Sequence, residues 1–219
     1  MFNQETFRAY EQFFIEKDDN APSFELLEGQ GAVMISAPHS VEQTRNNQVK
    51  YAEPQAGALA KMLHDALHCP VIYKRKNCGD DANFDENCAY KQALCKYVKD
   101  NNIALLLDLH QLSPTRKITI NIGTGKYKNV SNRQFVETAV QAFEKQNIGK
   151  VAIDKPFGAT YPFTVSAYVA SVCKISCLQI EIHSDALRLD KEEPQTESIF
   201  NALIELVKNA TKIIQGEES

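Results

Sequence analysis

The stretch IALLLDLHQLSPTR, residues 103–116, decides how the fold is interpreted. Its five consecutive apolar residues, from Ile103 to Leu107, predict a strand that is buried on both faces of a sheet. Asp108 and His110 follow two positions apart, so in an extended chain they point to the same side. Ligands of open α/β sheets sit at the carboxyl ends of such strands. This pair is therefore a candidate for a functional site.

The composition is that of an ordinary globular protein: 219 residues, 43% hydrophobic and 24% charged. We expect one domain over residues 1–219, with residues 1–20 forming a helix that packs on it. The net charge of −4 gives no electrostatic argument for a nucleic-acid or membrane partner. No apolar run reaches transmembrane length and the N-terminus lacks a signal-peptide layout, so a cytoplasmic protein is expected. The oligomeric state stays open, and a homo-oligomer is compatible with the sequence.

Strand patterns alternate with helix patterns along the whole chain. This alternation predicts an α/β fold, with a mixed, mainly parallel sheet and helices on both faces. Residues 117–122 alternate polar and apolar side chains, as an exposed or edge strand would. The expected strands cover about 23–27, 32–36, 70–73, 103–107, 117–122, 151–153 and 176–182, and the expected helices 4–17, 54–68, 86–101, 131–147, 163–173 and 193–214.

A candidate metal site begins after the strand at 32–36. His39 and Glu42 form an H-x-x-E segment, which can supply one nitrogen and one carboxylate oxygen to the same ion. His110 would complete a His₂Glu set with an open position for water, which is the arrangement of catalytic zinc sites. The alternative is that His39 and Glu42 are ordinary loop residues.

Glu181 lies inside the apolar strand at 176–182. Burying a charged carboxylate is costly unless something compensates it, and a nearby metal ion with its water would do so. Glu181 would then be a general base, although a structural ion pair with an arginine is an alternative. Arg45 and Arg116 each lie six residues past a candidate histidine. Either would stabilise an oxyanion if it faced the pocket.

Four short motifs occur in a fixed order, each at a predicted strand end: S-A-P-H-S at 36–40, H-x-x-E at 39–42, D-L-H at 108–110 and L-Q-I-E at 178–181. With these motifs the chain, from about Val33 to Arg188, resembles the N-formylglutamate amidohydrolase family. That family lies within the wider zinc carboxypeptidase-like (phosphorylase/hydrolase-like) fold of succinylglutamate desuccinylase and aspartoacylase. The resemblance implies a zinc-dependent amidohydrolase that cleaves a C–N amide bond of a small N-acyl amino acid or short peptide.

The resemblance also implies residue roles. His39, Glu42 and His110 would hold one Zn²⁺ per chain, and Glu181 and Arg116 would be catalytic. Glu53 is an alternative to Glu42, because relatives often carry an acidic residue there. The substrate-binding residues would be Arg45, Asn83 and Asp108, with Asp108 also suited to orient His110.

The chain departs from the family at one position. Relatives carry a D-x-N-R segment whose arginine holds the substrate carboxylate, and here the segment at 81–84 ends in Phe84. Phenylalanine cannot make the bidentate contact of a guanidinium. Arg45, Arg75, Arg116 and Arg188 remain as replacements, with Arg45 and Arg116 preferred. Two other functions stay open: an inactive metal- or ligand-binding homologue, and a carboxypeptidase-type peptidase.

Overall fold

Three neighbouring strands form the centre of the sheet in the computed structural model, which describes residues 1–217. They are β2 (Val33–Ala37), β6 (Leu105–Leu112) and β9 (Ser176–His183), and they run parallel to one another. Almost every residue of the three is buried. Helices cover both faces of the sheet, which explains why these strands read as nearly continuous apolar runs.

The other strands extend the sheet on both sides, in the order β1-β5-β2-β6-β9-β7-β8. Two pairs, β1 with β5 and β7 with β9, are antiparallel, and the remaining pairs are parallel. The predicted mixed, mainly parallel α/β fold is thus confirmed. A separate hairpin, which was not predicted, lies in the loop after β2. The bounds are β1 Phe24–Leu27, β5 Val71–Lys74, β7 Ile120–Gly123, β8 Val151–Ile153, and β3 Gln43–Arg45 with β4 Gln48–Lys50 in the hairpin.

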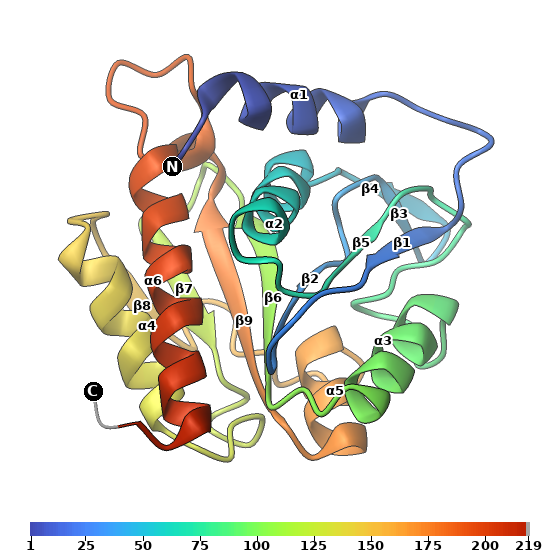
Figure 1. The fold of residues 1–219 in the computed structure, drawn as a ribbon. Helices are drawn as coiled ribbons and strands as arrows, with labels where there is room; N and C mark the ends of the chain where they lie inside the picture. Colours follow the sequence, from blue (N-terminus) through green and yellow to red (C-terminus); the bar gives the residue numbers. More distant parts are fainter. Residues whose placement is uncertain (218–219) are drawn as a thin grey trace.

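Helices pack on both faces of the sheet (Figure 1). One face carries α2 (Pro54–Leu67), α4 (Gln134–Lys145) and α6 (Thr196–Gln215), and α1 (Gln4–Ile15) packs on α2. The other face carries α3 (Ala89–Asp100) and α5 (Val165–Cys173). A short 3₁₀ helix, Ser184–Leu187, follows β9. Within residues 1–217, none of the helices has the length and apolar character needed to cross a membrane.

Two strand predictions need correction. β6 begins at Leu105 and continues five residues past Leu107, so the strand is longer than the predicted 103–107 and includes Asp108 and His110. Pairing with β9 along the full length keeps this segment extended. The segment predicted as an edge strand, 117–122, supplies β7, which is buried and lies between β9 and β8. The short strand β8 occupies the edge instead.

Candidate functional site

Two histidines and one glutamate meet at the carboxyl end of the central strands. His39 follows β2, His110 lies on β6, and Glu53 directly precedes α2. The carboxylate of Glu53 bridges the imidazoles, with Oε1 3.0 Å from His39 Nδ1 and Oε2 3.1 Å from His110 Nδ1. The backbone of Glu53 is fixed as well, because its N–H donates to the carbonyl of His39 at 2.7 Å.

The outer nitrogen of each imidazole contacts a second carboxylate. His39 Nε2 lies 2.9 Å from Asp81 Oδ1, and His110 Nε2 lies 3.3 Å from Asp108 Oδ2. This network assigns a hydrogen to each Nε2, which leaves the Nδ1 lone pairs facing the oxygens of Glu53. Acceptors that face one another at 3 Å repel unless a proton or a cation lies between them. The donor set therefore fits a zinc ion, for which such carboxylate–histidine pairs are typical outer partners.

Burial and the charges of neighbouring groups set the protonation of the cluster. Burial alone lowers the pKa of His39, but the charge of Glu53 and the hydrogen bond with Asp81 outweigh it and raise this pKa to about 9. Burial alone raises the pKa of Glu53, but the two imidazoles outweigh it and lower this pKa to about 2. In the absence of metal, the cluster thus holds a proton against Glu53 at neutral pH.

We expect the zinc affinity to rise with pH between about 6 and 9. Zinc binds neutral imidazole, so below the His39 pKa of about 9 binding must expel a proton. The apparent dissociation constant should fall by about tenfold per pH unit for each proton released. Competition against a chromophoric chelator over a pH series, corrected for protonation of the chelator, measures this slope. A flat profile across this range would contradict the protonation described above.

The acidic partners outside the ligand set should affect zinc affinity more weakly than the ligands. Asp81→Asn is expected to lower the zinc affinity by about 10–100-fold, because the amide orients the imidazole of His39 less well. Asp100→Asn is a matched control, since Asp100 and its ion-pair partner Lys96 on α3 are both exposed. Equal affinities of the two variants would show that Asp81 does not act through His39.

The prediction that Glu42 is the third ligand is wrong. Glu42 is 41% exposed and pairs with Lys17 at 3.1 Å, away from the histidines. Among residues 1–217, the group that could hold a metal ion comprises His39, Glu53 and His110, whose candidate ligand atoms lie within 4.8 Å of one another. The loop turns directly after His39 into the hairpin of β3 and β4, which carries Glu42 outward and returns the chain to Glu53.

Glu181 lies beside this cluster. It is opposite His110 in the register of β6 and β9, where neighbouring strands are about 4.8 Å apart. Gln179 donates from Nε2 to Glu181 Oε1 at 2.7 Å. Burial raises the pKa of Glu181 to about 7, although the His110 charge opposes the shift. A carboxylate that titrates near neutrality is suited to accept and return a proton.

A cavity of about 580 Å³ opens onto the cluster and brings together most of the predicted site residues. Arg45, Asn83, Arg116 and Glu181 all line it. The complete lining comprises His39, Arg45, Glu53, Asn83, Phe84, His110, Gln111, Ser113, Arg116, residues 156–161, Thr164, Gln179 and Glu181.

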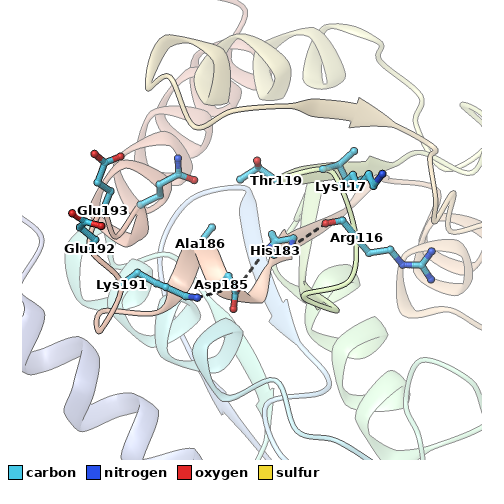
Figure 2. Close-up of a pocket in the computed structure, with 11 residues that line it drawn as sticks. Arg116, Lys117, Thr119, His183, Asp185, Ala186, Lys191, Glu192 and Glu193 are labelled. Carbon is cyan, nitrogen blue, oxygen red and sulfur yellow. Dashed lines mark hydrogen bonds and ion pairs between the residues drawn. The ribbon is translucent and has the colours of Figure 1, made fainter.

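The two arginines of the cavity differ in their partners. Arg45 is paired with Asp81, with Nε and one terminal nitrogen 2.9 and 2.8 Å from Oδ2. Arg116 has no ion-pair partner among residues 1–217, and its guanidinium lies 5.3 Å from the Phe157 ring centroid. Its backbone carbonyl instead accepts from His183 at the edge of a neighbouring pocket of about 490 Å³. Figure 2 shows the Arg116 guanidinium pointing away from Asp185 and Lys191 in that pocket.

Two of the predicted substrate-binding residues, Asp108 and Asn83, have side chains that already hydrogen-bond to other parts of the protein. Asp108 is fully buried behind His110, does not line the cavity, and also accepts from Ser166 at 3.2 Å. A direct substrate contact by Asp108 is therefore incompatible with its position. Asn83 lines the cavity, but its side-chain oxygen accepts from the backbone N–H of Val165 at 2.7 Å.

Sequence reasoning missed Asp81, Gln179 and Tyr161. Asp81 lies in the segment 81–84, and Gln179 lies in the L-Q-I-E motif at 178–181. Polar residues inside these motifs could therefore have been predicted to contact a ligand or the base. Tyr161 lies in a loop without a motif, and only the structure brings it to the cavity.

No protein-family model and no curated protein sequence matches the chain. Several solved structures share its fold. Gene product Atu2144 from Agrobacterium tumefaciens is 15% identical, with 89% of this chain and 97% of that chain covered and a TM-score of 0.59. A bacteriophage poly-gamma-glutamate hydrolase is 11% identical, with 91% and 94% covered and a TM-score of 0.59.

A metallo-carboxypeptidase from Burkholderia cenocepacia is 10% identical, with 97% of this chain and 70% of that chain covered and a TM-score of 0.55. Identities this low show a shared fold alone. The chain thus has a carboxypeptidase-like hydrolase fold.

Proposed function

We propose that the protein is a zinc-dependent amidohydrolase that cleaves the C–N amide bond of a small N-acyl amino acid, as the N-formylglutamate amidohydrolase family does. The observation that carries the proposal is the bridging of two imidazole Nδ1 atoms by Glu53 next to the buried Glu181. The carboxypeptidase-like fold and the S-A-P-H-S, D-L-H and L-Q-I-E motifs support it.

Each residue has a distinct task. His39, Glu53 and His110 would hold the zinc ion, which when bound lowers the pKa of water to about 7 and polarises a carbonyl. Glu181 accepts a proton from a water molecule that attacks the amide carbonyl, and then returns it to the leaving amine. Asp81 and Asp108 keep the two imidazoles oriented.

Arg116 is the cation best placed to act on substrate charge. It lines the cavity without a carboxylate partner among the described residues, whereas Asp81 already neutralises Arg45. A donor directed at developing negative charge stabilises an oxyanion most effectively when it has no competing partner. Arg116 would therefore stabilise the tetrahedral oxyanion or hold the substrate carboxylate.

A panel of N-formyl and N-acetyl amino acids tests the proposed function. We expect the zinc-loaded protein to release formate or the acyl acid, a chelator to abolish release, and added zinc to restore it. Stoichiometric zinc without turnover of any compound would favour an inactive binding homologue.

A carboxypeptidase-type peptidase is the second candidate. The Burkholderia cenocepacia metallo-carboxypeptidase shares the fold, and the cavity of about 580 Å³ has room for a short peptide. Release of a free C-terminal amino acid from short peptides, without acyl-acid release from the panel, would favour it.

A further inference from the structure

Lys91 places an ammonium group in the interior. It lies on α3 and only 1% of its surface is exposed. Its Nζ donates to the carbonyl oxygens of Phe163, at 2.9 Å, and of Asp85. The Tyr168 ring centroid lies 4.7 Å away. No carboxylate of residues 1–217 forms an ion pair with it, although a buried ammonium normally requires one.

The two carbonyls belong to different loops that both line the cavity. Asp85 belongs to the segment 75–88 between β5 and α3, and Phe163 belongs to the segment 154–164 between β8 and α5. A second link lies directly after the second loop, because Asn83 accepts from the N–H of Val165, the first residue of α5. Lys91 therefore connects two walls that are far apart in the sequence.

Each loop contributes one ring to an aromatic wall, which we define as Phe84 and Tyr161. The rings are stacked, with centroids 5.4 Å apart and an interplanar angle of 20°. Both line the cavity, and Tyr161 is 41% exposed. The Arg45 guanidinium carbon lies 4.7 Å from the Phe84 centroid, so the wall is supported from the metal side of the site as well.

The aromatic wall differs chemically from the rest of the cavity. The cation that contacts it is Arg45, whose charge is already neutralised by Asp81, whereas the guanidinium of Arg116 lies against the Phe157 ring elsewhere in the cavity lining. A charged group placed there would lose water without gaining a partner, whereas an apolar or aromatic group would gain buried area and ring contacts.

We propose that Phe84 and Tyr161 form a subsite for an apolar or aromatic side chain of the substrate, and that Lys91 is the positioning residue that holds the two halves of this subsite together. The inference rests on the proposed function, since it names the substrate class of the same site.

Substrate preference tests the subsite. For the zinc-loaded protein, kcat/KM should be at least about tenfold higher for N-formylphenylalanine than for N-formylglutamate. Phe84→Arg should reverse the order, because the new guanidinium pairs with the glutamate side chain. Turnover with a preference for N-formylglutamate would overturn the subsite and leave the proposed function intact.

Lys91→Met tests the positioning role. The KM for N-formylphenylalanine should rise by about tenfold, while kcat and zinc affinity stay within about twofold because no ligand changes. The thermal midpoint should be equal or higher, since replacing a buried charge by an apolar side chain of similar size is often neutral or stabilising. Lys96→Met is the matched control on the exposed side of α3, and it should change none of these. An unchanged KM in Lys91→Met would refute the role.

A reporter separates this inference from the hydrolase proposal. The chain has no tryptophan, so Phe84→Trp introduces a single indole into the wall. Adding Lys91→Met should shift its emission to longer wavelength and increase quenching by iodide, whereas adding Lys96→Met should not. This response without any turnover would support the positioning role of Lys91 while the proposed function fails, and identical spectra would refute that role.

Discussion

Glu53→Ala is expected to lower the zinc affinity of the protein by more than about 100-fold. Loss of a residue that only hydrogen-bonds to a ligand typically lowers metal affinity by about 10–100-fold, and loss of a ligand should cost more. The substitution removes one of three ligands and leaves the two imidazoles without the anion between them. The side chain makes no capping hydrogen bond to α2, so its removal should not unfold the helix start. Equilibrium dialysis followed by metal analysis measures the loss.

Glu42→Ala is the matched control for this variant. Glu42 is the other glutamate of the same loop, and among residues 1–217 it forms an ion pair with the exposed Lys17 alone. We expect its zinc affinity to stay within about twofold of the wild type, as for a typical surface substitution. Loss of zinc in Glu42→Ala, with retention in Glu53→Ala, would mean that the loop adopts a different conformation when it binds metal.

The sheet was largely predictable, because the strands that form its centre contain nearly continuous apolar runs. The runs before Asp108 and around Glu181 place those residues correctly on parallel neighbours. β7 was misjudged because alternation does not show which strand lies at an edge. Three residues of β8 cover β7, and Asn121 donates to the Phe157 carbonyl at 2.6 Å, so its polar group is satisfied although buried.

The ligand set was only partly predictable for a different reason. The histidine and glutamate of an H-x-x-E segment can bind the same ion only if the segment forms a single turn. Here the segment leads into a hairpin instead. Glu53 reaches the site because the loop ends there, at the first turn of α2. The aromatic wall could not be predicted at all, since stacking of Phe84 on Tyr161 depends on how two distant loops meet.

Glu181→Gln is expected to retain zinc and to lower kcat by about 10²–10⁴-fold, the usual contribution of a general base. The amide has nearly the shape of the carboxylate, and its oxygen can still accept from Gln179 Nε2. It cannot take a proton from water near neutral pH. Zinc affinity should stay within about threefold, because Glu181 is outside the ligand set.

The pH profile distinguishes a base from a group that merely fills space. Activity of the wild type should fall as the pH drops through the Glu181 pKa, since only the ionised carboxylate accepts a proton. That pKa is about 7 without metal. The positive charge of bound zinc opposes the shift that burial causes, so the acidic limb should lie at or below about pH 7. With zinc kept saturating at every pH, this limb should disappear from the residual activity of Glu181→Gln. A variant with wild-type kcat and the same acidic limb would exclude Glu181 as the base, because the group that titrates would then have to lie elsewhere in the cavity.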